Sequence, residues 1–178
     1  YHEFDGTILL ENIPVTNYNL RSLRSLTGVV LNQHDIFNGT LYENISMGCT
    51  NIDAKHIMDE AARIGLRDFI AQLPEGLNTP LMSGGKKLPK KIIQKVLLLR
   101  ALVGKPRLLL LEEPFEGIED EPRRLIIDYL LSRESPRTML ISCNDIDFAS
   151  QCDKVIFLEN GRIKAMGTWR DIQPIIKH

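Results

Sequence analysis

Apolar and polar positions alternate along the chain in blocks that predict strands and helices in turn. Apolar runs at 28 to 32, 107 to 114 and 138 to 143 predict strands, and the run at 107 to 114 is continuous, as in a strand buried on both faces. Residues 121 to 133, between the last two runs, have helical spacing. Because a strand, a helix and a second strand in this order form a parallel unit, the pattern predicts an α/β fold with a parallel sheet.

The two ends of the chain carry further strand patterns. Residues 6 to 15, GTILLENIPV, predict one β-strand, and the polar residues 19 to 26 predict a short helix after it. Near the other end, residues 154 to 163 contain an Asn-Gly pair, which is the strongest two-residue hairpin signal. We therefore expect the last two strands to pair antiparallel.

The middle of the chain has the period of a helix. Residues 53 to 73 place four apolar residues at roughly helical intervals, which predicts a helical insert between the strands. These residues are Ile57, Ala61, Ile64 and Leu66.

Composition limits the kinds of partner. The 178 residues are 43% hydrophobic, which is enough for one globular unit with a core of its own. Lysine and arginine number 22 against 23 acidic residues, and aromatic residues make up only 6% of the chain. A net charge of −1 without a basic footprint or a stacking platform argues against nucleic acid as a partner.

Cysteines and apolar runs bear on the compartment. Cys49, Cys143 and Cys152 form no C-x-x-C pair and are too few for a disulfide framework, so we expect buried thiols in a reducing cytosol. No run approaches the ~18 to 20 apolar residues of a spanning helix, and the first residues lack the pattern of a signal peptide. Any link to a membrane is expected to come through a partner or a missing part of the chain.

Four phrases stand in a fixed order along the chain: GVVLNQHDIFNGTLYENI, LPEGLNT, RALVGKPRLLLLEEP and DKVIFLENGRIKAMGT. Their order and spacing resemble the nucleotide-binding domain of ATP-binding cassette (ABC) transporters of the exporter type, over essentially the whole chain. The resemblance implies an ABC-type ATPase fold, which is P-loop NTPase-like, with a core parallel sheet and a helical subdomain. It also implies that the N-terminal P-loop part is missing, because no G-x-x-x-x-G-K-[ST] string occurs here.

The same resemblance implies how the chain is divided. Residues 1 to 178 are expected to form a single incomplete nucleotide-binding domain. Its helical subdomain is expected at about 41 to 100, its α/β core at 20 to 40 and 101 to 178, and a residual β-subdomain strand at 6 to 15.

The Ser-Gly-Gly at residues 83 to 85 looks like the family's LSGGQ signature but lies at the wrong distance from the Arg-Ala-Leu that follows. Arg100 lies 17 residues after Ser83 and 11 after Pro89, and the family has the shorter spacing between its signature serine and this arginine. The resemblance therefore places a degenerate signature six residues further on, at Leu88, Pro89, Lys90, Lys91 and Ile92.

This degenerate signature is expected to keep a helix and lose a phosphate grip. The family's serine and glycine amides reach a phosphate, whereas Pro89 has no N–H and suits the first helical position. Lys90 and Lys91 at a helix N-terminus oppose the macrodipole at a cost of about 0.3 to 1 kcal/mol each. Two interpretations remain open: solvated surface lysines, or lysines that contact an anion or nucleotide.

Other functional positions implied by the resemblance have changed as well. Glu112 stands where the family has its Mg²⁺-associated aspartate, and Glu113 stands where the family's carboxylate activates water, although an acidic pair facing solvent is the alternative. Glu119 replaces the D-loop aspartate. Asn32 falls on the Q-loop glutamine, and a shift of one residue would give that role to Gln33 as the alternative.

Asn144 falls on the switch histidine, whose charge and proton chemistry an amide does not supply. ATP and Mg²⁺ are the cofactors that the resemblance implies, and the alternative is that this chain by itself holds none.

The resemblance implies a transmembrane domain and a second nucleotide-binding domain as partners, and a place at the cytoplasmic face of the membrane. We expect a degenerate ATP-binding cassette that neither binds ATP tightly nor hydrolyses it alone. The alternatives are an active ATPase in the full-length protein and a non-enzymatic interaction module. Ile36 and Phe37 are candidate docking residues for the transmembrane domain, with burial in the core as the alternative role.

Overall fold

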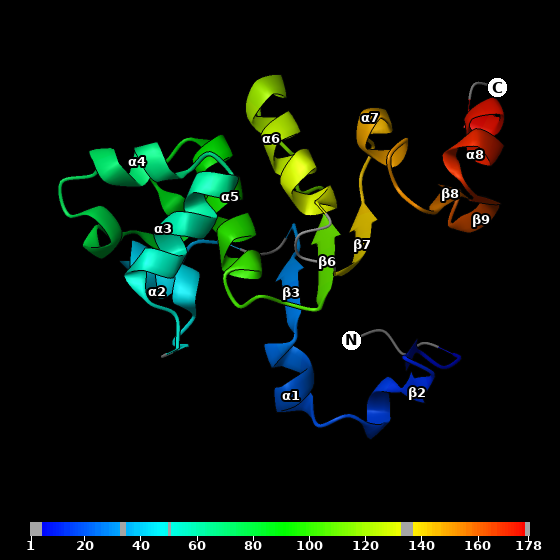
Figure 1. The fold of residues 1–178 in the computed structure, drawn as a ribbon, viewed down its shortest axis with the longest axis horizontal. Coiled ribbons are helices and arrows are strands. Elements are labelled where there is room, and N and C mark those ends of the chain that lie inside the picture. The colour runs from blue at the N-terminus through cyan, green and yellow to red at the C-terminus, as the bar shows by residue number, and fades with distance from the viewer. Residues whose placement is uncertain (1–4, 33–34, 50, 133–136, 177–178) are drawn as a thin grey trace. The chain divides into compact units, whose positions relative to one another are not determined.

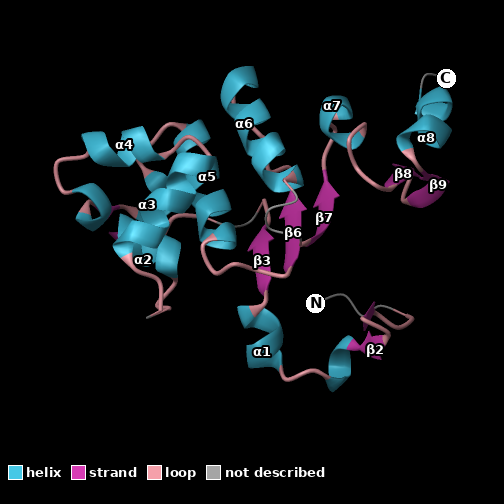
Figure 2. Ribbon diagram, in the orientation of Figure 1, coloured by secondary structure: helices cyan, strands magenta, loops and turns pink. Residues whose placement is uncertain are grey.

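The computed structural model describes residues 5–32, 35–49, 51–132 and 137–176. The chain divides into two compact units, Tyr1–Ser142 and Cys143–His178. Figures 1 and 2 show mixed helices and strands in the first unit and a hairpin with helices in the second. The expected division into an α/β core and a helical subdomain stays a prediction.

A three-stranded parallel sheet forms the centre of the first unit, as predicted. Its strands are β3 (Thr27–Val30), β6 (Leu108–Glu112) and β7 (Thr138–Ser142), in the order β3-β6-β7, and they lie side by side in Figure 2. Within the described residues β7 is an edge strand, and its Leu140 is 63% exposed.

The strand β6 is less covered than its sequence predicts. Leu109 and Leu111 are buried, whereas Leu108 and Leu110 are only half-buried. A Cβ added to Gly28, the partner of Leu109 in β3, would meet the carbonyl oxygen of Ala101, so α5 (Lys90–Leu102) packs on that face. Among the described residues the opposite face of β6 has the thinner cover, and the expectation of burial on both faces was wrong.

The helices beside the sheet confirm the predicted helical insert in part. Residues 53 to 73 form two helices, α3 (Ala54–Arg63) and α4 (Arg67–Gln72), separated by Gly65 with a φ of 64°. The four apolar residues predicted at helical intervals are fully buried. Also in this unit are α1 (Leu20–Ser25), α2 (Leu41–Ser46), α6 (Asp120–Leu131), the short pair β4 (Gly39–Thr40) and β5 (Pro80–Leu81), and the 3₁₀ turns η2 (Gly76–Asn78) and η3 (Ser83–Gly85).

The N-terminal segment differs from the single strand predicted over 6 to 15. Two strands of two residues, β1 (Leu9–Leu10) and β2 (Ile13–Pro14), pair antiparallel before a 3₁₀ turn η1 (Val15–Asn17). Glu11 and Asn12 between them have φ values of 51° and 65°. Two successive residues in the left-handed region reverse the chain, which a continuous strand does not allow.

The second unit consists of α7 (Ile146–Ala149), the antiparallel pair β8 (Val155–Glu159) and β9 (Arg162–Gly167), and α8 (Trp169–Ile176). Asn160 and Gly161 connect β8 to β9 with φ values of 51° and 75°. Positive φ at both central residues is what a type I′ hairpin turn requires, and the strands pair antiparallel, so the predicted hairpin is confirmed.

The cysteines are less buried than expected from the sequence. Cys49 is exposed, and Cys143 and Cys152 are half-buried. Burial, with Cys143 and Asp153 nearby, raises the pKa of the Cys152 thiol. Over the described part of the chain, none of the helices is both long and apolar enough to span a membrane.

Candidate functional site

The carboxyl ends of β3 and β6 bring Asn32 and Glu112 together. Residues at the carboxyl ends of parallel neighbours meet at one edge of the sheet, where α/β proteins commonly bind ligands. Here the backbone N–H of Asn32 donates to Glu112 Oε2 at 3.0 Å. Gln33, the alternative Q-loop residue, lies outside the described residues.

Glu113 adopts an unusual backbone conformation directly after β6. Its φ is 43°, in the left-handed region that non-glycine residues occupy at a cost of about 1 to 2 kcal/mol. Its N–H donates to the carbonyl of Ser142 at 2.8 Å, and its own carbonyl accepts from Gln94 Nε2 at 3.2 Å. The neighbouring strand and α5 therefore hold this residue in place from two sides.

The segment predicted as the degenerate signature begins α5. Lys90 is the first helical residue, and Pro89 precedes the helix with φ −58° and ψ 145°, so the proline stands at the N-cap position and not at the first helical position. Its ψ is not helical, because the backbone of an N-cap residue is still extended. Leu88 is half-buried, and Ile92 is buried.

The two lysines of this segment bind carboxylates of the same chain. Lys90 Nζ lies 2.5 Å from Glu116 Oε1, and Lys91 Nζ lies 2.7 Å from Glu119 Oε1. The hydrogen bond and the charge of Lys91, together with Lys95, lower the pKa of the Glu119 carboxyl. The sequence left two interpretations of these lysines, contact with solvent and contact with an anion or nucleotide. The structure shows a third arrangement, in which each lysine pairs with a carboxylate of the same chain.

A pocket of about 260 Å³ lies where α5 passes the ends of β3 and β6. Three of the polar residues that line this pocket were not singled out in the sequence: Asp35, Gln94 and Glu116. Glu116 had one detectable signal, because it stands three residues before Glu119 in the turn that follows a strand ending in carboxylates. The polar residues that line the pocket are Asn32, Asp35, Lys90, Gln94, Glu112 and Glu116.

A buried amide and an arginine fix the loop between β3 and β4. The Asn44 side chain is completely buried, accepts from the N–H of Phe37 at 3.0 Å and donates to the carbonyls of Phe37 and Thr40, each at 3.0 Å. Arg100 Nε donates to the Asn44 carbonyl at 2.7 Å, and its guanidinium lies 5.8 Å from the centre of the Phe37 ring. Burial lowers the pKa of Arg100.

This loop separates the two candidate docking residues. Ile36 is 1% exposed and belongs to the core, whereas Phe37 is 38% exposed. These two adjacent apolar residues of the loop therefore differ sharply in burial. Only Phe37 remains available for docking.

The Ser-Gly-Gly turn is attached to the same loop. The Ser83 N–H donates to Asn38 Oδ1 at 2.7 Å, and the Gly84 N–H donates to the carbonyl of Ile36 at 2.9 Å. Gly84 has a φ of 73°, which glycine adopts without strain. The amides of this turn are thus bound inside the protein.

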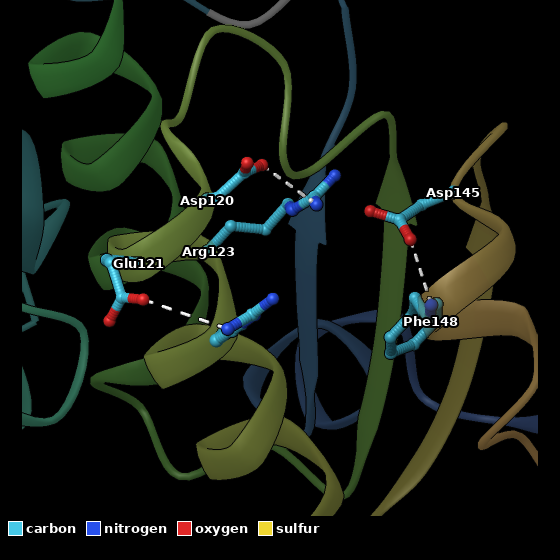
Figure 3. Close-up of polar contacts among 6 residues, drawn as sticks. Asp120, Glu121, Arg123, Asp145 and Phe148 are labelled. Atoms are coloured by element: carbon cyan, nitrogen blue, oxygen red, sulfur yellow. Dashed lines mark hydrogen bonds and ion pairs between the residues drawn. The ribbon is translucent and has the colours of Figure 1, made fainter.

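Asn144 belongs to the second unit and is exposed just before α7. Asp145 begins that helix by accepting from the N–H of Phe148 at 2.8 Å, as Figure 3 shows. Figure 3 also shows the Asp120–Arg123 ion pair of 3.0 Å on α6. The role of Asn144 at the switch-histidine position stays a prediction.

The role of Glu112 near a magnesium ion stays a prediction, which rests on the chemistry of the side chains after β6. Mg²⁺ is usually held by one or two carboxylates together with substrate oxygens, and Glu112 and Glu113 supply carboxylates. Among the residues that the structure describes, no group of three or more His, Cys, Asp or Glu could hold a metal on its own. The start of α5 offers little to a phosphate, because Pro89 has no N–H to donate. Lys90 and Lys91 already form ion pairs with Glu116 and Glu119.

Comparison with known families decides the relationship. Residues 1–116 match the model of the family described as ABC transporter, which is well over half of the chain. The chain belongs to the ABC transporter family. The resemblance predicted from the sequence is therefore confirmed.

Individual ABC transporter relatives align over nearly the whole chain. An uncharacterized ABC transporter ATP-binding protein, YknV of Bacillus subtilis, is 31% identical over 162 residues, which are 91% of this chain and 27% of the relative. The ATP-dependent lipid A-core flippase of Saccharophagus degradans is 29% identical over 167 residues, covering 94% of this chain and 28% of the relative. The chain thus spans less than a third of the length of these ABC relatives.

The ABC-type fold predicted from the sequence is also confirmed. A bacterial Atm1-family ABC exporter, solved with ATP bound, has a TM-score of 0.89 and 26% sequence identity. The alignment covers 99% of this chain and 31% of that structure. The parallel sheet β3-β6-β7 with helices around it is therefore the ABC ATPase architecture.

Proposed function

We propose that this chain is part of the ATP-binding cassette of an ABC exporter, a domain that couples ATP binding and hydrolysis to transmembrane transport. We further propose that its nucleotide site is degenerate, so that the chain alone neither binds ATP tightly nor hydrolyses it. The family match and the relatives named as exporters and flippases support the first part.

The observation that carries the second part is the start of α5. Pro89, Lys90 and Lys91 stand at the predicted signature, where a phosphate needs a free N–H and a close backbone approach. The ammonium groups there bind Glu116 and Glu119 at 2.5 and 2.7 Å, so a phosphate would have to displace a carboxylate from each. These contacts support the proposal that the chain keeps the ABC fold but has lost phosphate binding at the signature.

Millimolar Mg·ATP is expected to leave the thermal unfolding midpoint of the 178-residue chain unchanged. A ligand present at 100 times its dissociation constant adds about 2.7 kcal/mol, which would raise the midpoint by roughly 5 to 10 °C. The measurement is a thermal melt with ATP, with Mg²⁺ alone as the control. Clear protection together with ATP turnover that Glu113→Gln abolishes would overturn the proposal.

A second candidate function is an active ATPase in a longer polypeptide that contains this chain. The geometry that favours it is Glu113, held in a strained backbone conformation beside Glu112 at the end of β6. In this reading Glu113 is the general base and Glu112 lies near Mg²⁺. Turnover by the longer protein that falls about 10²- to 10⁴-fold in Glu113→Gln would favour it.

We propose a transmembrane domain and a second nucleotide-binding domain as partners, at the cytoplasmic face of a membrane. Phe37 is our candidate contact with the transmembrane domain, because the residue is 38% exposed while the buried Asn44 fixes its backbone. A docking surface gains affinity when its backbone is ordered before the partner arrives.

Phe37→Ala is expected to weaken assembly with the transmembrane part more than it destabilises the chain. The hydrogen bonds to Asn44 use the Phe37 backbone and survive the change, whereas the exposed ring and its contact with Arg100 are lost. Co-purification with the transmembrane part and urea unfolding measure the two effects. Leu20→Ala, at a residue 63% exposed on α1, is the matched control, and equal losses of assembly and stability in Phe37→Ala would refute docking.

A further inference from the structure

The first turn of α5 and the loop after β6 are joined by three side chains from one side of the helix. Lys90 binds Glu116, Lys91 binds Glu119, and Gln94, one turn further along, donates to the carbonyl of Glu113. The partners in each ion pair are 26 and 28 residues apart in sequence. The contacts therefore connect separate elements of the first unit.

We propose that Lys90, Lys91, Glu116 and Glu119 form a charged clasp that fastens the start of α5 to the loop of residues 113 to 119. The clasp goes beyond the proposed function, because it requires no nucleotide and no partner. It gives Lys90 and Lys91, which differ from the family signature, a structural role of their own.

The loop is shaped to receive the lysine that lies along it. Gly117 has a φ of 72°, and a Cβ added there would lie 3.6 Å from Cδ of Lys90 and 3.9 Å from its Cβ. The aliphatic stem of Lys90 therefore runs past the glycine while its ammonium group reaches Glu116. Lysine commonly lays its apolar stem along a surface in this way while its ammonium group stays in contact with water.

The clasp also resolves the charge problem at the start of α5. Two ammonium groups near a helix N-terminus oppose the dipole, and the charge of Lys91 also acts on the ammonium group of Lys95, one turn further along. Glu116 and Glu119 place two carboxylates at the same end, where negative charge is favourable. The loop thus supplies the anion that the helix sequence lacks.

The strength expected of the clasp is modest and depends on salt. All four side chains are partly exposed, between 44% and 69%. Exposed pairs of this kind typically shift an equilibrium by about 1.5- to 5-fold and weaken as salt screens them. Two pairs on adjacent residues of one helix share part of the ordering cost.

The test is a charge-swap cycle of Lys91→Glu, Glu119→Lys and the double variant, followed by amide hydrogen exchange of residues 113 to 119 in the whole chain. Each single variant is expected to speed exchange of this loop about 2- to 5-fold at low salt. The double variant should return it to within about 1.5-fold of wild type, and 1 M salt should reduce all differences. Lys164→Glu, which breaks a 2.8 Å pair with Glu159 in the β8–β9 hairpin, is the matched control and should leave the loop unchanged.

Single variants that leave the loop unchanged would overturn the clasp, and so would a double variant that does not recover. If a charge reversal unfolds the whole chain, exchange will also rise in α3, and Lys91→Gln then replaces it as the milder variant. The ATP melt measures a different property, so failure of the clasp and failure of the proposed function are distinguishable.

Acid provides a further check on the same pair. Lys91 lowers the pKa of Glu119 in the folded chain, with Lys95 adding a smaller effect. A lowered carboxyl pKa contributes stability above the unfolded value, near 4.5, and that stability is lost as pH falls through the folded value. Loop exchange in Glu119→Gln, compared with wild type at each pH, should therefore differ at pH 7 and converge in acid. A difference that persists in acid would contradict the pairing.

Discussion

Gly28→Ala is expected to be among the most destabilising single substitutions in the first unit, at about 3 kcal/mol. A Cβ at this position would lie 2.1 Å from the carbonyl oxygen of Ala101 and 2.7 Å from Cδ2 of Leu109. The first of these atoms is backbone, in the last turns of α5, so it yields only if the helix moves away from β3. Overpacking of a well-packed core costs about 1 to 3 kcal/mol, and a clash with backbone belongs at the upper end. Urea unfolding measures the change.

Gly104→Ala is the matched control for this substitution. A Cβ added to Gly104 would meet nothing within 4 Å, and no positive φ favours glycine there. Its free energy of unfolding should stay within about 0.5 kcal/mol of wild type, as is usual for surface changes. Similar losses in both variants would mean that the contact between α5 and β3 is looser than the distances indicate.

Asn44→Ala is expected to lower the free energy of unfolding by a comparable amount, because it removes buried hydrogen bonds. The amide is fully buried and satisfies the N–H of Phe37 and the carbonyls of Phe37 and Thr40. Each buried polar group left without its partner costs about 1 to 3 kcal/mol, and some of these will find water. We therefore expect a loss of about 2 to 4 kcal/mol in urea unfolding, with faster amide exchange in residues 36 to 40.

Asn78→Ala in the 3₁₀ turn η2 serves as the control, because Asn78 is exposed. It should change the free energy of unfolding by no more than about 0.5 kcal/mol. An Asn44 variant with wild-type stability and unchanged exchange at residues 36 to 40 would show that the network does not hold the loop.

The parts of the fold that could be predicted depend on local signals. β7 and the β8–β9 hairpin follow from an apolar run and from an Asn-Gly pair, which act within a few residues. The N-terminal strand was predicted wrongly because Glu11 and Asn12 both adopt positive φ without a glycine to signal the turn. The pattern of apolar residues does not record such a reversal.

The candidate site shows the same limit over longer distances. The contact between Asn32 and Glu112 follows from two parallel strands that end together, so sequence reasoning could anticipate it. The pairs of Lys90 with Glu116 and Lys91 with Glu119 could not be anticipated, because they depend on where α5 begins and on the positive φ of Gly117. Tertiary geometry alone joins these residues.

The edge strand β7 makes protein concentration a variable in the experiments above. Within the described residues it pairs only with β6, and Leu140 on it is 63% exposed. An open strand edge with apolar side chains is a template for pairing between molecules, which competes with unfolding and refolding. We therefore expect reversible unfolding only in dilute samples of this chain, and midpoints that drift with concentration would report self-association rather than the stability of one molecule.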